Sequence, residues 1–355
     1  MNIFCGENAQ GKTNLIEAVW LCTGCKSFRG AKEKDIVGFG KDISEVAVKF
    51  ENSQRIQEII MRNGRKGRFI SLNGVKLPSL ANLFGNLNAV VFTPEDLELS
   101  KGSPDCRRNY INVGIAQLKS RYRLAVVNYN RSLMHRNSVI KRLRENVRDN
   151  GELDVWNMQL AKYGTLITSE RIQYVKEIAP IAAELYDKIS SGREALSLSY
   201  QSGIFRRDEQ PENAEDMQQA MKIYLEHLED NKPNDIRNGI TQAGIHRDDI
   251  ITKINGLNSR EFGSQGQSRS IALVMKLAQA ELFRQKTGEC PIVLLDDVLS
   301  ELDPSRQEFI LQKLGGFQVF VTCCDIASAR RFGDGKLFTV DNGTVKEAEN
   351  VSSSG

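Results

Sequence analysis

The spacing of hydrophobic residues divides the chain into stretches of two kinds. Near both ends, short apolar or alternating runs are separated by glycine, proline and polar turns, a pattern that indicates strands mixed with helices. Between them, residues 99–239 have mainly long helical periodicity with few glycines or prolines. We therefore predict an α/β fold in which residues 1–98 and 240–355 form one domain and residues 99–239 form an inserted, mainly helical arm.

The individual elements follow from the same pattern. Strands are expected at Met1–Cys5, Ile43–Phe50, Ile56–Met61, Phe69–Leu72, Val90–Phe92, Leu196–Tyr200, Ile250–Ile254, Ile292–Leu295, Val319–Thr322, Leu337–Val340 and Thr344–Lys346. Helices are expected from about Gly11, over about Arg107–Val147, Val155–Ser190 and Gln267–Gln285, and after Pro304. The dipeptide Asn63-Gly64 signals a hairpin turn.

Composition excludes some classes of protein. Of the 355 residues, 40% are hydrophobic and 26% are charged, as in soluble globular proteins. No apolar run approaches the roughly 18 residues that cross a bilayer, and no signal peptide precedes the glycine-rich loop at Gly6. An odd count of seven cysteines suits a reducing compartment, so we expect a cytoplasmic protein with no membrane partner. The pair Cys22 and Cys25 lacks the further ligands of a zinc site, and we interpret its spacing as coincidence.

A phosphate-binding motif lies near the start of the chain. The segment from Gly6 to Thr13 fits G-x-x-x-x-G-K-[ST] at every fixed position, between a predicted strand and a predicted helix. Its backbone N–H groups and the helix start favour phosphate. We predict ATP as the cofactor, with Lys12 at the β- and γ-phosphates and the Thr13 hydroxyl on Mg²⁺. The predicted nucleotide-binding residues of this motif are Gly6, Glu7, Asn8, Ala9, Gln10, Gly11, Lys12, Thr13 and Asn14.

The second half of the site is expected where the apolar strand Ile292–Leu295 ends in Asp296 and Asp297. Asp296 would hold Mg²⁺ through water, and Asp297 would orient or deprotonate the attacking water. A buried strand followed by a solvated acidic turn is the simpler alternative, but adjacent carboxylates there are costly without a cation. We predict catalytic roles for Lys12, Asp296 and Asp297. Because the loop and the acidic strand must share one site, the helical middle of the chain is an insertion.

Two further segments distinguish among P-loop proteins. Ser264, Gln265, Gly266 and Gln267 precede a predicted helix. In ABC-type ATPases such a signature segment binds the γ-phosphate of the nucleotide held by the partner subunit. The later run Ser300-Glu-Leu-Asp303 resembles the D-loop that passes between subunits. A GTPase is rejected, because Asn231-Lys-Pro-Asn234 ends in Asn where the guanine motif has Asp, and it lies far from a suitable strand.

Together these motifs resemble the SMC-like branch of ABC-type ATPases, and further patches resemble the RecF family within it. The patches are Thr93–Leu97, Lys101–Pro104 with Arg107 and Arg108, Leu153–Trp156, His246–Asp249 and Ser264–Gln267. The resemblance covers nearly the whole chain. It implies an ATP-dependent homodimer with a helical arm on each head and slow, DNA-dependent ATP hydrolysis. It also implies binding to duplex DNA and single-strand/duplex junctions, and cooperation with RecR and RecO in loading RecA.

Three features of the sequence depart from known patterns: the start of the chain, Ile245 and Cys323. The family has additional edge strands before the phosphate loop, so we expect this chain to be truncated or to begin at a misassigned start, with an exposed sheet edge. Ile245 stands where the family has proline, and we expect little effect. Cys323 stands where transporter-type ABC ATPases place a histidine that senses the γ-phosphate, so we expect slow hydrolysis.

The segment Lys101–Arg148 concentrates positive charge in a chain whose net charge is only +3. Against two acidic residues it has twelve basic ones: Lys101, Arg107, Arg108, Lys119, Arg121, Arg123, Arg131, Arg136, Lys141, Arg142, Arg144 and Arg148. Phosphate contacts dominate sequence-independent DNA affinity, so we predict DNA contact here, with a solvated helix face as the alternative. The run His246–Asp249 could suggest a metal site, but alternating side chains cannot all converge, and we expect structural or nucleotide-linked hydrogen bonds.

Two other functions compete with that of a DNA-repair ATPase. The motor subunit of an ABC transporter would want a glutamate after Asp296 and a histidine at position 323, where this chain has Asp297 and Cys323. A chiefly structural SMC-like protein would want longer coiled-coil arms than residues 99–239 provide. We therefore predict an ATP-driven dimer that grips DNA.

Overall fold

The computed structural model describes the chain except for residues 66, 147, 149, 212–215, 333–334 and 349–355. The chain divides into two compact units. The first consists of Met1–Leu99, Glu184–Arg193 and Gln265–Gly355, and the second of Ser100–Ala183 and Glu194–Ser264. The division expected from the sequence, 1–98 plus 240–355 and 99–239, stays a prediction. The compact units differ from it by placing residues 240–264 in the second unit and residues 99 and 184–193 in the first.

A six-stranded sheet forms the centre of the first unit. In spatial order its strands are β13 (Thr344–Glu347), β12 (Lys336–Asp341), β1 (Asn2–Cys5), β11 (Val319–Cys323), β10 (Ile292–Leu295) and β6 (Ala89–Phe92). All neighbours are parallel except the hairpin of β12 and β13. Every residue of β6 and β10 is buried, which explains their continuous apolar runs, because a parallel sheet is covered on both faces. The strands expected here from the sequence are confirmed.

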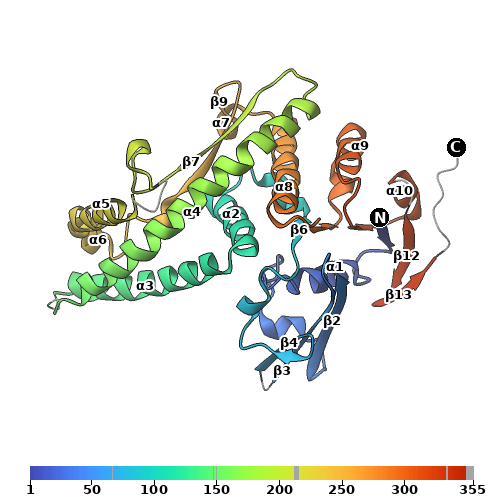
Figure 1. The fold of residues 1–355 in the computed structure, drawn as a ribbon, viewed down its shortest axis with the longest axis horizontal. Helices are drawn as coiled ribbons and strands as arrows, with labels where there is room; N and C mark the ends of the chain where they lie inside the picture. The colour runs from blue at the N-terminus through green and yellow to red at the C-terminus, as the bar shows by residue number, and fades with distance from the viewer. Residues whose placement is uncertain (66, 147, 149, 212–215, 333–334, 349–355) are drawn as a thin grey trace. The chain divides into compact units, whose positions relative to one another are not determined.

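Helices cover both faces of this sheet. Figure 1 shows α8 (Gln265–Thr287), α9 (Pro304–Lys313) and α10 (Ile326–Arg331) on one side and α1 (Lys12–Leu21) on the other. The middle of α8 is buried nearly all round, and its Lys276 donates to the Val91 carbonyl at 2.8 Å and pairs with Asp96 at 2.7 Å. These contacts hold α8 to β6 and to the turn that follows it. The helix expected at about Gln267–Gln285 is confirmed, with two more residues at each end.

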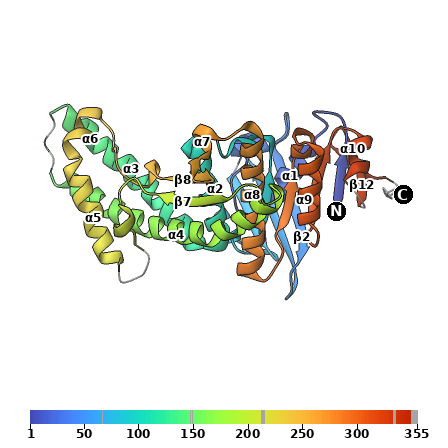
Figure 2. The same ribbon diagram turned by 90° about the horizontal axis from the view of Figure 1, so that it is seen from above.

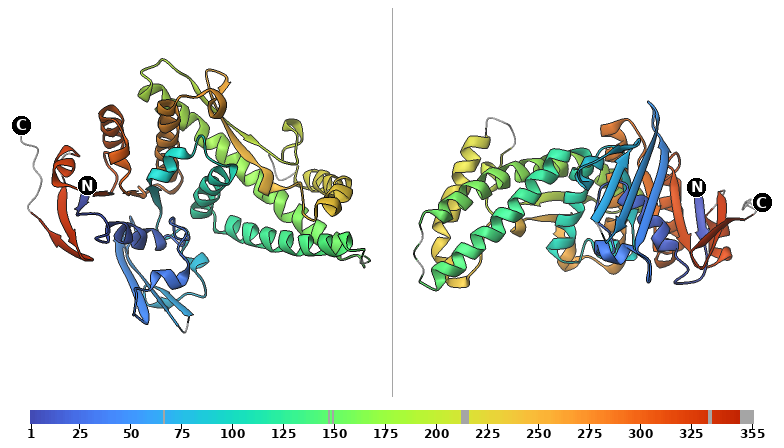
Figure 3. Two further views of the ribbon diagram at one scale, coloured as in Figure 1. Left: turned by 180° about the vertical axis from the view of Figure 1, so that it is seen from behind. Right: turned by 90° about the horizontal axis from the view of Figure 1, so that it is seen from below.

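A second sheet in this unit is antiparallel. It consists of β2 (Ile43–Glu51), β3 (Ile56–Gly64), β4 (Gly67–Leu72) and β5 (Val75–Lys76), the blue strands in the right view of Figure 3. The predicted hairpin is present, but its predicted turn at Asn63-Gly64 is wrong. Asn63 pairs with Arg68 and Gly64 with Gly67, so the strand continues through the dipeptide. Asn63 is a buried strand residue whose Oδ1 accepts a hydrogen bond from Arg68, which no turn signal reveals.

The second unit combines long helices with a three-stranded sheet. Its helices are α2 (Pro104–Leu118), α3 (Ser120–Arg144), α4 (Glu152–Ile189, of which the part to Ala183 belongs here), α5 (Met217–Asp230) and α6 (Lys232–Asn238). Its strands are β7 (Leu196–Gln201), β8 (Asp249–Ile254) and β9 (Leu257–Asn258). Figures 1 and 2 show β7 and β8 running beside α4. The hydrogen bond from Arg136 to Asn157 and the pair Lys119–Glu170 show that α3 and α4 are antiparallel.

One helix expected over about Arg107–Val147 is two in the structure. The break falls at Lys119, whose φ of −137° and ψ of 95° are extended. No glycine or proline marks this position, and the two helices on either side of it pack against each other. Residue 147, the expected end, lies outside the described residues.

Ion pairs and hydrogen bonds occupy the interior of the second unit. Arg136 and Asp235 are both 0% exposed and form an ion pair at 2.6 Å. The buried carboxylate of Asp248 accepts from Arg171 at 2.9 Å, from the Gly203 N–H at 2.7 Å and from the Tyr200 hydroxyl. Breaking such a pair from one side typically costs about 3–5 kcal/mol, because a charge is left buried without a partner. These contacts therefore fix how the helices pack around the sheet.

The segment His246–Asp249 belongs to this interior. His246 contacts the Tyr129 hydroxyl and the Thr241 carbonyl, each at 3.2 Å. Asp248 pairs with Arg171 and Asp249 with Arg107, so the three side chains point to different partners. Among the residues described, no group of three or more His, Cys, Asp or Glu side chains is placed to hold a metal ion. Of the two alternatives expected from the sequence, structural or nucleotide-linked hydrogen bonds, these contacts are of the structural kind.

Stability should depend on pH through His246. Burial lowers the pKa of His246 below the ordinary 6.5. The charges of Arg247 and Arg108 lower this pKa further, and the hydrogen bond to the Thr241 carbonyl partly opposes the decrease. As pH falls through 6.5, the unfolded chain binds a proton that the folded chain does not, so the free energy of unfolding decreases. His246→Gln should remove this decrease, measured by urea unfolding at pH 7.5 and 5.5. His227→Gln is the control and should retain it, and equal slopes in both variants would contradict the assignment.

Candidate nucleotide site

The phosphate loop connects β1 to α1, as expected. A Cβ on Gly6 would lie 2.2 Å from the Val340 carbonyl oxygen of β12, so only glycine fits there. Gly11 has a φ of 104°, in the region that favours glycine, and immediately precedes α1. The two fixed glycines of the motif are thus required by a close approach and by a left-handed turn.

Contacts inside the loop hold its shape. Lys12 Nζ donates to the carbonyls of Gly6 at 2.6 Å and Glu7 at 2.8 Å. The turn between β12 and β13 supports the loop from outside, because the N–H of Asn342 donates to Gln10 Oε1 at 2.6 Å and that of Gly343 to the Gln10 carbonyl at 2.9 Å. Glu7, Asn8, Ala9 and Asn14 are exposed, while Lys12 is buried. Of the nine predicted residues, all but Lys12 are therefore at least partly exposed.

The acidic pair, Asp296 and Asp297, lies beside this loop. Asp296 directly follows β10 and is 7% exposed. Its Oδ1 accepts from the Thr13 hydroxyl at 3.1 Å and from the Thr322 hydroxyl at 2.9 Å. The N–H of Asp297 donates in turn to the Thr322 hydroxyl at 2.9 Å. The structure thus brings together residues from the carboxyl ends of three neighbouring parallel strands.

The charge of the pair makes a cation favourable. Burial raises the pKa of Asp296, the bonds from Thr322 and Thr13 oppose that rise, and the neighbouring Asp297 adds to it. A divalent cation would favour the ionised form. The donor set fits Mg²⁺, which prefers oxygen ligands such as the Thr13 hydroxyl and the Asp296 carboxylate. Their roles as ligands, and those of the loop residues toward ATP, remain predictions.

Asp297 begins a short turn that leads to the D-loop. Its φ of 54° is left-handed, and the Ser300 hydroxyl donates to its carbonyl at 2.6 Å. At the end of this segment Asp303 accepts from the Arg306 N–H and caps α9. This conformation directs the backbone away from β10 immediately after the acidic pair.

The signature segment is bound to the D-loop. Ser264 and Gln265 are exposed, and Gln265 is the first residue of α8. Arg306 donates to the Gly266 carbonyl at 2.9 Å and also pairs with Asp303. Arg269 donates to the Glu301 carbonyl at 2.7 Å. The assignment of Ser264, Gln265, Gly266 and Gln267 to a partner's nucleotide stays a prediction.

Three residues of the site were not found from the sequence. Thr322 links the two acids, and Arg29 Nη1 donates to Asn14 Oδ1 at 2.8 Å, with a positive charge that favours ionised Asp296. Cys324, and not Cys323, faces the loop: its thiol donates to Asn8 Oδ1 at 3.1 Å, while Cys323 is buried. The comparison of position 323 with the transporter histidine stays a prediction, but the cysteine that contacts the loop is Cys324. Only the alternation of side chains along β11 could have indicated this.

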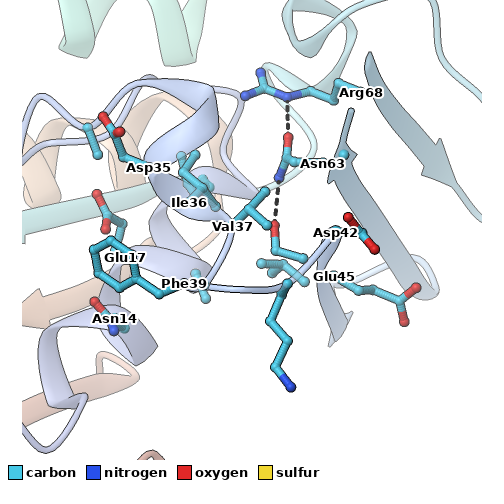
Figure 4. Close-up of a pocket in the computed structure, with 18 of the residues that line it drawn as sticks. Asn14, Glu17, Asp35, Ile36, Val37, Phe39, Asp42, Glu45, Asn63 and Arg68 are labelled. Atoms are coloured by element: carbon cyan, nitrogen blue, oxygen red, sulfur yellow. Dashed lines mark hydrogen bonds between the residues drawn. The ribbon is translucent and has the colours of Figure 1, made fainter. Parts of the chain in front are cut away.

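A cavity adjoins the nucleotide motif. It has a volume of about 1110 Å³ and lies between α1, residues 35–42 and the ends of β2 to β4 (Figure 4). Asn14 and Glu17 line it from α1, and Asn63 and Arg68 line it from the antiparallel sheet. Its volume is slightly larger than the roughly 300–1,000 Å³ of typical small-molecule sites. Of the predicted nucleotide-binding residues, Asn14 is among those that line it.

The basic segment is partly neutralised by the fold. Of its twelve basic residues, at least six form ion pairs with described residues of the second unit: Arg107 with Asp249, Arg108 with Asp105, Lys119 and Arg121 with Glu170, Arg136 with Asp235, and Arg142 with Glu152. Most of these acids lie far away in sequence. The count of charges along Lys101–Arg148 therefore overstates the charge available to DNA. Exposed basic residues outside these pairs include Arg131, Lys141 and Arg144.

The parallel sheet, the phosphate loop and the acidic pair define the head of an ABC-type ATPase. A solved Smc head domain from Pyrococcus furiosus has this fold, with a TM-score of 0.51 at 16% identity over 99% of this chain and 90% of that one. No helix in the described part of the chain has the length and apolar character needed to span a membrane.

Similar proteins identify the branch of ABC-type ATPases to which the chain belongs. No protein-family model matches the chain. This chain is 38% identical to the DNA replication and repair protein RecF of Clostridium kluyveri over 351 residues, and this match covers 97% of this chain and 93% of that protein. It is 36% identical over 354 residues to RecF of Clostridioides difficile, with 99% and 93% covered. The solved recombination mediator protein RecF-ATPrS in the RecFOR pathway is 33% identical with a TM-score of 0.90, covering 98% of this chain and 91% of that one.

The chain belongs to the RecF family. Its resemblance to RecF, inferred from Thr93–Leu97, His246–Asp249 and the signature segment, is confirmed. The membership also decides between the functions weighed from the sequence, in favour of the repair ATPase over the transporter motor.

Replacing Thr322 by valine should disable the acidic pair. The variant keeps the shape of a residue that is 2% exposed but removes the donor to Asp296 and the acceptor for the Asp297 N–H. We expect the free energy of unfolding to fall by about 1–3 kcal/mol and kcat for ATP hydrolysis to fall roughly tenfold. Thr322→Ser retains the hydroxyl and should restore most of both. Equal losses in the two variants would contradict this role for the hydroxyl.

Proposed function

We propose that this protein is an ATP-dependent DNA clamp of recombinational repair and replication-fork maintenance, working in the cytoplasm. The observation that supports it best is the convergence of Lys12, Thr13 and Asp296 at one edge of the sheet in a chain of the RecF family. The loop N–H groups and Lys12 bind the phosphates of ATP, Thr13 and Asp296 hold Mg²⁺, and Asp297 positions the attacking water.

In this proposal the active form is a homodimer. The signature segment Ser264–Gln267 of one protomer completes the nucleotide site of the other, so two heads close only when both hold ATP. Two features support this arrangement: the exposed start of α8 at Gln265, and the contacts of Arg306 that join Gly266 to the D-loop. Hydrolysis opens the dimer.

The partner of the closed dimer is DNA, as duplex and at single-strand/duplex junctions. Two relatives are DNA replication and repair proteins, and a solved relative belongs to the RecFOR pathway, so cooperation with RecR and RecO in loading RecA is part of the proposal. Exposed Arg131, Lys141 and Arg144 supply charges for the phosphate backbone.

Dimerisation tests the first step. Sedimentation velocity of the wild-type protein should show a monomer without nucleotide and a dimer with Mg-ATP. Lys12→Ala should abolish the shift, because the phosphates lose their buried cation. Ser264→Arg should also remain monomeric but still bind ATP, since its own phosphate loop is unchanged. A Lys12→Ala protein that dimerised normally with ATP would refute the clamp.

DNA binding tests the second step with matched charges on α3. The double variant Arg131→Ala/Lys141→Ala removes two exposed residues outside the ion pairs described above. It should weaken duplex binding and reduce the slope of log affinity against log salt by about 1.8, at about 0.9 per lost phosphate contact. The control Arg121→Ala/Arg142→Ala removes residues already paired with Glu170 and Glu152 and should change the slope less. Equal slopes in both variants would place the DNA elsewhere.

A further inference from the structure

One cysteine of this chain lies inside the nucleotide site. Cys324 follows β11 and is exposed. Its thiol donates to Asn8 Oδ1 at 3.1 Å, lies 4.0 Å from Lys12 Nζ and lies 4.0 Å from Asp297 Oδ1. Three residues with predicted roles in the site, two from the phosphate loop and one from the acidic pair, therefore surround one sulfur atom.

The strand register explains why this sulfur faces the site. Thr322 is in β11 and Cys324 directly follows this strand, and both side chains approach Asp297, so they lie on the same side. Thr322 already contacts Asp296 and Asp297. Cys323 lies on the opposite face, buried at the same register as Cys5 of the neighbouring β1. Cys324 is thus the next inward-facing position of the site after Thr322.

We propose that Cys324 is a positioning residue of ATP hydrolysis and that its thiol makes the ATPase sensitive to modification by soft electrophiles. The inference rests on the proposed ATPase function. The thiol contacts the loop on one side and Asp297 on the other, so it sets the distance between the residues that hold the phosphates and the residue that positions water. A group attached to the sulfur occupies that space and separates Lys12 from Asp297.

The chain supplies its own controls for this proposal. Of seven cysteines, Cys5, Cys22, Cys25 and Cys323 are buried, and Cys106, Cys290 and Cys324 are exposed. Cys106 lies in α2 and Cys290 precedes β10, so neither belongs to the nucleotide site. Labelling of these two thiols reports general reactivity, and labelling of Cys324 reports the site.

The first experiment is labelling with N-ethylmaleimide, followed by mass spectrometry. The thiol gives its proton to solvent, the sulfur adds to the carbon–carbon double bond, and the adjacent carbon takes up a proton, so nothing is oxidised. Mg-ATP should slow labelling of Cys324 at least tenfold and leave Cys106 and Cys290 unchanged. Labelling should abolish ATP hydrolysis in the wild type and in Cys106→Ser/Cys290→Ser, while the activity of Cys324→Ser should resist it.

The second experiment separates positioning from a merely structural role. Cys324→Ala should lower kcat about three- to tenfold with little change in KM for ATP, the effect of one lost hydrogen bond near the reacting groups. Cys324→Ser retains a donor to Asn8 and should recover part of kcat.

The outcomes distinguish this inference from the proposed function. ATP binding to the unlabelled wild type is measured first, by titration of a fluorescent ATP analogue. A protein that binds no nucleotide would overturn the proposed function and this inference with it. A protein that binds and hydrolyses ATP, but labels at Cys324 equally fast with and without Mg-ATP, would overturn only this inference. Loss of activity in labelled Cys324→Ser equal to that in labelled wild type would do the same.

Discussion

A carboxylate with almost no access to water sits at the point where three parallel strands end, and the nucleotide site is arranged around it. Asp296 is stable there because the hydroxyls of Thr13 and Thr322 donate to it. The Thr13 hydroxyl comes from α1, which follows β1, and the Thr322 hydroxyl comes from β11. In the sheet β11 lies between β1 and β10, the strand that Asp296 follows. Parallel strands end at the same edge, so the topology alone brings together residues about 280 positions apart. A change in strand order would separate the phosphate loop from its acid.

The second unit uses its charges differently. Arg136, Arg107 and Arg171 are buried and are paired with Asp235, Asp249 and Asp248. A buried ion pair adds little net stability, but it strongly disfavours packings that leave one partner alone. These pairs therefore select one arrangement of helices around β7 and β8. They also explain why so basic a segment can lie in a chain of net charge +3: part of its charge is structural.

How much could be read from the sequence differs between the backbone and the contacts. The phosphate loop, Asp296 and the strand Ile292–Leu295 could be predicted, because glycines at fixed spacing and a continuous apolar run are local signals. The break at Lys119 could not, since no glycine or proline marks it and the packing of α2 on α3 exists only in the fold. The contacts of Thr322, Arg29 and Cys324 could not be predicted either, because they form only when segments distant in the sequence come together. The pairing of Lys119 with Glu170 was missed for the same reason, and a local count of charge therefore misjudged the surface.

The same contacts give the acidic pair a physical connection to the start of α8. Ser300 binds the backbone of Asp297, the segment then ends at Asp303, and Asp303 pairs with Arg306. Arg306 also holds the Gly266 carbonyl, and Arg269 holds that of Glu301. A shift of the backbone at Asp297, which is already left-handed, would disturb the hydrogen bond that its carbonyl accepts from Ser300. The apolar side chains of this segment, Val298, Leu299 and Leu302, are buried, so their packing restricts where the segment can move. The D-loop is therefore more than a connection between β10 and α9, because its contacts join Asp297, proposed to position water, to the segment proposed to face a second protomer.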